Sequence, residues 1–182
     1  PHPLVRSMSI WTLSRVSAWL QDQQQDGEVT LNIECWRILI EALGDANKRV
    51  QLSAATALCK FIEVSGRNCS LQGDELKALV SAIFLALKCY QKRNMLILYD
   101  LIGAVVSVDG ASLYFDSEAF QYWRSIAVSL VDRINAESIG DSSIFSLIEA
   151  LMALLPLDSE GTLLDAGKRQ EMNFKALNLA AQ

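Results

Sequence analysis

The sequence predicts an all-α protein, an α-α superhelix of about three to four antiparallel helix pairs. Apolar residues recur every three or four positions along almost the whole chain, which is the spacing of amphipathic helices. No segment alternates strictly between apolar and polar residues, so we expect no β-sheet. Val5 and Val50, like Leu13 and Leu58, lie 45 positions apart, which indicates a structural unit that repeats at this interval.

The first part of the chain predicts three helices separated by polar or glycine-containing breaks. The first covers about residues 3–23, with Pro3 in its first turn, where a missing N–H costs little. The second covers about residues 28–43 and ends at Gly44, since glycine commonly follows a helix C-terminus. The third follows a short polar break and covers about residues 48–64.

Three more helices are predicted in the middle of the chain. A fourth covers about residues 71–90 and carries Asp74 and Glu75 in its first turns, where the helix dipole favours acidic side chains. A fifth covers about residues 93–108. A sixth covers about residues 117–136 and begins at a serine, which caps helix N-termini well.

Two further helices complete the prediction. A seventh covers about residues 141–155 and is stopped by Pro156, and a weaker eighth covers about residues 162–180. Paired in order, the helices divide the chain into the second helix of a truncated repeat (1–27), three repeats (28–66, 67–110 and 117–157) and the start of another (158–182).

Residues 45–58 carry the most regular motif. An aspartate, a Val-Gln pair, the small pair Ala54-Ala55 and a leucine follow one another in an order that resembles the HEAT consensus. Small residues at these positions let paired helices approach closely. A period of about 40–47 residues with two helices each is typical of HEAT or armadillo-type repeats, so we expect a HEAT-repeat solenoid.

The start of the chain and its composition suggest cut ends. Residues 1–3 lead directly into a helix, and the mean hydropathy of +0.22 is high. Each repeat of a solenoid buries its apolar face only against its neighbours. We therefore expect an excised piece of a larger solenoid that self-associates through its ends.

Charge and hydropathy exclude some partners. With 16 Lys and Arg against 21 Asp and Glu, the chain lacks the basic excess of nucleic-acid binders, so a basic partner is the better expectation. No stretch of about 18 uncharged apolar residues exists, so we expect no membrane span.

The sequence offers little for catalysis, metals or cofactors. His2 is the only histidine, no CxxC pair exists, and we expect the four cysteines to be reduced and mostly buried. Cys35 follows Glu34 but has no base to activate it. No phosphate-binding glycine motif is present, and we interpret Gly103 as a close-packing position. We therefore expect no enzymatic activity, no metal site and no cofactor.

The four tryptophans need burial or a ligand. Core packing is the simplest interpretation for Trp19, Trp36 and Trp123. Trp11 differs, because the equivalent residue 45 positions later is the polar Thr56. We expect the Trp11 indole to be partly exposed and available for a proline, tyrosine or long apolar side chain.

Three stretches carry a more specific likeness. Residues 3–15, 47–51 and 90–103 resemble the transportin (karyopherin-β2) family of importin-β-type nuclear import receptors. The likeness covers about residues 3–155 and fades in the remainder. It implies a central piece of a HEAT-repeat receptor that moves between cytoplasm and nucleus.

The resemblance implies partners and a site. Members of the family bind nuclear localisation signals of the proline-tyrosine type on a concave arch, and Ran-GTP and nucleoporins engage the full-length protein. By position, Met8 and Trp11 match the apolar pair that receives Pro-Tyr, with Arg15 on the same helix. Glu63 and Asp100 match acidic contacts for the basic part of the signal.

Departures from the family affect ligand preference. Leu52 and Ser107 replace acids, and Lys60 and Ala104 replace threonines. The loss of the acids and the gain of a cation at Lys60 weaken attraction for a basic peptide. The other half of the Pro-Tyr pocket would lie before residue 3, so we expect weak binding by this chain alone. The alternative is a HEAT-repeat interaction scaffold without a transport role.

Overall fold

The structure, a computed structural model, describes residues 2–20, 29–65, 74–109 and 117–136, together with residues 146, 148 and 150. These described residues contain helices and no strand. The helices are α1 (Pro3–Arg15), α3 (Val29–Leu43), α4 (Lys48–Ser65), α5 (Asp74–Cys89), α6 (Lys92–Asp109) and α7 (Ser117–Ala136). The predicted all-α class is confirmed. Residues 146, 148 and 150 are helical, as predicted, whereas the predicted helix 162–180 lies outside the described residues.

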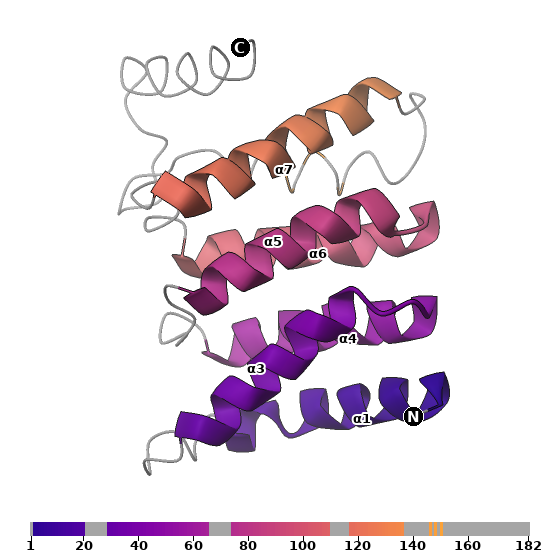
Figure 1. Cartoon of the computed structure of the whole chain (residues 1–182), viewed down its shortest axis with the longest axis vertical. Coiled ribbons are helices and arrows are strands. Elements are labelled where there is room, and N and C mark those ends of the chain that lie inside the picture. Colours follow the sequence, from indigo (N-terminus) through magenta and orange to yellow (C-terminus); the bar gives the residue numbers. More distant parts are fainter. Residues whose placement is uncertain are drawn as a thin grey trace.

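The helices are arranged in two layers. In one layer α1 packs on α4 and α4 on α6; in the other α3 packs on α5 and α5 on α7. Contacts of α3 with α4 and of α5 with α6 join the layers. Figure 1 shows the pairs stacked along the long axis of the molecule, with α1 at one end. We call α1, α4 and α6 the second-helix layer, and α3, α5 and α7 the first-helix layer. This is the stacking that a HEAT-repeat solenoid requires.

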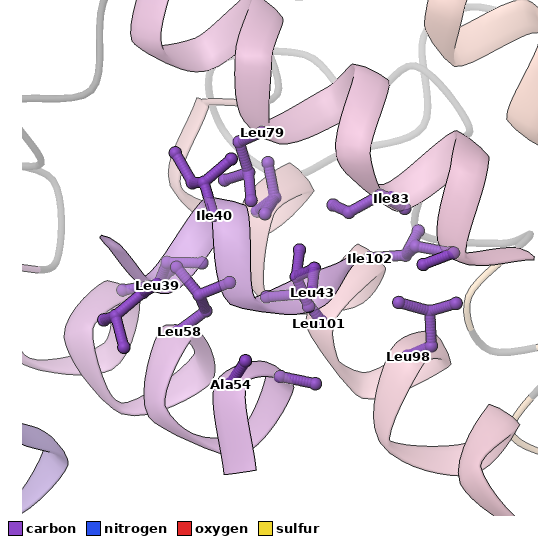
Figure 2. Close-up of a cluster of buried hydrophobic side chains, with 14 of the residues drawn as sticks. Leu39, Ile40, Leu43, Ala54, Leu58, Leu79, Ile83, Leu98, Leu101 and Ile102 are labelled. Atoms are coloured by element: carbon purple, nitrogen blue, oxygen red, sulfur yellow. The ribbon is translucent and has the colours of Figure 1, made fainter. Parts of the chain in front are cut away.

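The core lies between the two layers. Figure 2 shows side chains from α3, α4, α5 and α6 meeting in one cluster, among them Leu43, Leu58, Leu79 and Leu98, all fully buried. Burying one such side chain stabilises the fold by about 1.5–3 kcal/mol. Ala54 and its neighbour at 55 are also fully buried, consistent with small residues where helices approach.

Two of the tryptophans are buried, as predicted. Trp36 is 1% exposed and its ring meets Phe61 edge-on, with the ring centroids 5.4 Å apart. Trp123 is 5% exposed. Trp19, in contrast, is 55% exposed, so the interpretation of this residue as core is wrong. It lies in residues 17–20, beyond the end of α1.

The predicted helix 3–23 is interrupted. α1 ends at Arg15, and the Val16 N–H is shared between the carbonyls of Thr12 and Leu13, at 3.3 and 3.2 Å. Hydroxyl groups bond back to carbonyls along this stretch, for example Ser14 Oγ to Trp11 O at 2.6 Å. Such bonds compete with the helical ladder and bend it. Residues 17–20 are helical again after the break.

Polar groups fix the turn between α3 and α4. α3 ends just before Gly44, as predicted, and the Gly44 N–H donates to the Glu41 carbonyl at 3.1 Å. Asn47 Oδ1 accepts from the Arg49 N–H at 3.0 Å, which caps the N-terminus of α4. The Asp45 carboxylate accepts from the Asn47 N–H at 2.7 Å.

Polar contacts join neighbouring repeats, among them those made by Arg6, Tyr90 and Asn94. The Arg6 guanidinium of α1 donates to both Asp45 oxygens, at 2.8 and 2.9 Å. The buried Tyr90 hydroxyl lies 3.1 Å from the Leu43 carbonyl and 3.3 Å from that of Gln51. Asn94 Nδ2 donates to the Lys48 carbonyl at 3.2 Å. The joined residues lie 39–47 positions apart, close to the interval predicted from the sequence.

Two further expectations need correction. A Cβ built on Gly103 would meet nothing within 4 Å, so this glycine is not a close-packing position. Of the cysteines that the structure describes, Cys35 is buried, Cys59 is half-buried and Cys89 is exposed, so burial is less complete than expected. Cys69 lies outside the described residues. No helix in the described ranges has the length and hydropathy of a membrane span.

We predict that Asp45→Asn lowers the free energy of unfolding by about 1–2 kcal/mol, because it weakens charge-assisted hydrogen bonds across a repeat boundary. Urea unfolding followed by circular dichroism measures this. Glu34→Gln is the matched control, because Glu34 pairs with Arg37 within one exposed helix surface. Equal losses in the two variants would contradict the proposed role of the Arg6–Asp45 contact.

The same pair predicts a pH dependence. The hydrogen bond from Arg6 lowers the pKa of the Asp45 carboxyl below its ordinary 3.8, and the Asn47 N–H adds to this. A depressed pKa contributes stability that is present above the unfolded-state value and is lost as the pH falls through the folded-state value. The stability difference between the wild type and Asp45→Asn should therefore hold at neutral pH and shrink below pH 3.8. A difference that grows on acidification would contradict this.

We predict that Gly103→Ala raises the free energy of unfolding by about 0.5–1 kcal/mol, since alanine stabilises a helix interior relative to glycine and its methyl group has open space here. Thermal unfolding measures the change. Gly44→Ala serves as comparison because residue 44 lies outside a helix and should gain less. Destabilisation by Gly103→Ala would contradict the open surroundings.

Candidate functional site

The second-helix layer exposes a set of side chains that repeats from helix to helix. Lys48 and Lys92 lie 44 positions apart at the starts of α4 and α6, and Val5 of α1 corresponds to position 50 of α4. This register assigns each exposed residue of one helix an equivalent on the next. The candidate site can be read as rows that cross the three helices.

An apolar row lies near the N-terminal ends of these helices. Met8 of α1 is 52% exposed, and Leu4, one turn before it, is also exposed. Leu52 of α4 and Leu96 of α6 are equivalent to each other and are 41% and 40% exposed. Met8 itself is equivalent to the half-buried Ser53 of α4, so exposed apolar side chains lie on all three helices, but Met8 does not share the row of Leu52 and Leu96.

Trp11 occupies the next row. Its indole is 53% exposed, as predicted, and so is the equivalent Thr56 exposed on α4. The third member of this row is Asp100 of α6, also exposed. An exposed indole beside an exposed thioether offers a large apolar contact area to a ligand.

A row of cations follows. Arg15 and Lys60 are exposed at equivalent positions of α1 and α4. Lys60 Nζ forms an ion pair with the Glu63 carboxylate, one turn further along α4. Lys60 is one of the departures from the family. Its charge offsets part of the charge of Glu63, one of the predicted site residues.

The Cys59 thiol lies near the two predicted acids. Burial raises its pKa to about 12, and the negative charges of Asp100 and Glu63 act in the same direction. Both carboxylates thus act on the same sulfur although they come from different helices. The five sequence-predicted residues thus share one layer, while their role in binding stays a prediction.

The thiol of Cys35 does not favour nucleophilic chemistry. Burial and the adjacent Glu34 charge raise the pKa of the Cys35 thiol, whereas a nucleophilic thiol needs a lowered pKa. Within the described ranges, no three His, Cys, Asp or Glu side chains cluster as metal ligands would.

Sequence reasoning missed a basic depression at the end of the layer. It has a volume of about 490 Å³ and lies where the N-termini of α4 and α6 meet the start of α1. Its lining residues are His2, Pro3, Leu4, Ala46, Asn47, Lys48, Arg49 and Arg93. The signal was present in the sequence as two Lys-Arg pairs, at 48–49 and 92–93, spaced by the repeat interval.

The chain is similar to importin-type receptors from several organisms. It is 30% identical to transportin-1 of mouse and of human over 151 residues, 83% of this chain and 16% of those proteins. Transportin of Dictyostelium discoideum is 36% identical over 113 residues, 62% of this chain and 12% of that protein. Importin subunit beta-2 of Saccharomyces cerevisiae is 31% identical over 148 residues, 81% of this chain and 15% of that protein.

The matches cover only a small part of each relative. The chain spans about one sixth of the length of the curated relatives. No family model matches it.

We predict that Asp100→Asn speeds alkylation of Cys59 by iodoacetamide a few-fold, because removal of a nearby negative charge lowers the thiol pKa and raises the thiolate fraction. Site-resolved mass spectrometry of the native chain measures the rate for each cysteine. Glu41→Gln, a change on the first-helix layer, is the control and should leave Cys59 unchanged. Equal rates in wild type and Asp100→Asn would place the carboxylate away from the thiol.

Proposed function

Because the chain belongs to the transportin family, we propose that it supplies part of the surface on which a nuclear import receptor captures the localisation signal of its cargo. The carrying observation is the exposed pair Met8 and Trp11 on one face of α1. The signal is an extended peptide whose Pro-Tyr end packs on these two side chains.

Physical chemistry supports this use of α1. A tryptophan left half in water forgoes a large burial energy, and a ligand that covers it recovers that energy. Buried aromatic anchors carry most of the affinity in peptide interfaces. The equivalent position on α4 is the smaller Thr56, so only α1 offers a large aromatic contact in this row. This difference between the two helices sets the orientation of the peptide.

Charges arrange the rest of the ligand. Asp100, in the same row as Trp11, is the acid that attracts a basic residue of the signal. Glu63 contributes less, because its partner Lys60 offsets its charge. Arg15, one turn beyond Trp11, contacts the peptide backbone or the terminal carboxylate of the Pro-Tyr end.

The mechanism is reversible capture, with no covalent step and no cofactor. The peptide gains contact area on a preformed helical surface, so binding needs little rearrangement of this part of the receptor. Ran-GTP and nucleoporins act on the whole receptor, which moves between cytoplasm and nucleus. Release then follows from a change elsewhere in the solenoid, not from chemistry in this chain.

We predict that Trp11→Ala weakens binding of a fluorescein-labelled Pro-Tyr peptide about 30-fold, the loss of a hot-spot residue worth about 2 kcal/mol. Fluorescence anisotropy with the 182-residue chain measures the affinity. Trp19→Ala is the matched control, because Trp19 is equally exposed but lies beyond the end of α1.

The two variants separate the candidate functions. Loss of affinity in Trp11→Ala alone supports signal capture on α1. Equal affinities in both variants and the wild type would contradict it and favour a HEAT-repeat scaffold that holds other proteins by another face. Both side chains are exposed, so neither variant should change the free energy of unfolding by more than about 0.5 kcal/mol.

A further inference from the structure

The two layers differ in charge. Helices α1, α4 and α6 together carry seven Lys and Arg against three Asp and Glu. Helices α3, α5 and α7 together carry five Lys and Arg against six Asp and Glu. The second-helix layer is therefore net basic although the whole chain has a formal charge of −5. A surface that received only basic peptides would carry the opposite sign.

The positive charge is concentrated at one end of that layer. Lys48, Arg49 and Arg93 line the depression of about 490 Å³ and come from two different helices. All three side chains are exposed. Among the ion pairs formed by the described residues, none involves these three cations.

The nearest acids are not available to neutralise the depression. Asp45, in the loop beside it, is already bound through both oxygens by Arg6. Asp100 lies seven residues beyond Arg93 on α6, a rise of about 10 Å along the helix. The depression thus presents uncompensated positive charge toward solvent.

The depression is continuous with the apolar row. Leu4 belongs to its lining, and Met8 follows one turn later on the same helix. Asn47, which caps α4, also contributes to the lining. A ligand seated on Met8 and Trp11 can extend directly over the cations without leaving the second-helix layer.

We propose that this depression binds an acidic polypeptide segment, with Asp or Glu side chains next to the apolar anchor of the ligand. The proposal rests on the proposed function for the anchor and specifies the class of ligand. The ligand then has two parts: apolar residues on Met8 and Trp11, and carboxylates that pair with Lys48, Arg49 and Arg93.

A polypeptide fits better than a nucleic acid. The exposed Leu4 lines the depression, Met8 follows one turn later on α1, and these apolar side chains offer nothing to a phosphate backbone. No Phe, Tyr or Trp lines the depression, so it lacks the large aromatic platform on which bases stack. Carboxylates on a chain that also carries apolar residues satisfy both halves of the surface.

The test uses three fluorescein-labelled peptides that end in Pro-Tyr and differ only in a preceding flank of glutamate, serine or lysine. Anisotropy titrations with the 182-residue chain at low and moderate salt compare them. We expect the glutamate peptide to bind about tenfold more tightly than the serine peptide at low salt, and the advantage to fall as salt screens the exposed charges. Tighter binding of the lysine peptide would overturn the proposal.

Variants assign the effect to the depression. Lys48→Gln, Arg49→Gln and Arg93→Gln combined should remove the advantage of the glutamate peptide and leave the serine peptide unchanged. The combination of Arg37→Gln, Lys77→Gln and Lys88→Gln removes equal charge from the first-helix layer and should have no effect on the advantage. Loss of the advantage in both combinations, or in neither, would overturn the proposal.

The remaining outcomes separate this proposal from the proposed function. If Trp11→Ala leaves all affinities unchanged while the three-cation variant still removes the glutamate preference, the acidic-segment site stands and capture on α1 fails. Tighter binding of a single-stranded oligonucleotide than of the glutamate peptide would overturn the proposal that the ligand is a polypeptide. Light scattering could instead show a dimer of this chain that the three-cation variant abolishes. That result would overturn the proposed ligand, because a second copy of the chain would then occupy the depression.

Discussion

Each helix pair in this chain has apolar faces that only a neighbouring pair can cover, and that requirement governs the rest of the structure. The core in Figure 2 draws on α3, α4, α5 and α6 together, so no pair has a core of its own. Polar contacts then set the register between pairs. Arg6 with Asp45, and Tyr90 with the carbonyls of Leu43 and Gln51, join residues about one repeat apart.

A fixed register turns one helix face into a surface of three. Because α1, α4 and α6 pack side by side, equivalent positions form rows that cross the three helices. Trp11 and Asp100 share a row although they lie 89 positions apart in the sequence. The candidate binding surface is thus a product of the stacking. We expect a change at a repeat boundary, such as loss of the Asp45 carboxylate, to disturb the alignment of the rows.

The sequence predicts the fold well because amphipathic periodicity and the 45-residue interval both follow from burial. It predicts the exposure of Trp11 for the same reason, through the polar Thr56. Prediction from the sequence fails where a feature depends on the local geometry of one side chain. The break after Arg15 depends on hydroxyl groups that bond back to the helix. The open space around Gly103 and the exposure of Trp19 depend on what stands opposite. The basic depression depends on the register between α4 and α6, which places Arg93 with Lys48 and Arg49.

We propose that a ligand crosses α1, α4 and α6. Photo-crosslinking tests this most directly, using a Pro-Tyr peptide with a benzophenone group at successive positions and mass spectrometry of the adducts. The account predicts adducts at exposed residues of these three helices, moving from α1 toward α6 as the group moves along the peptide. Adducts confined to α3, α5 or α7 would contradict it.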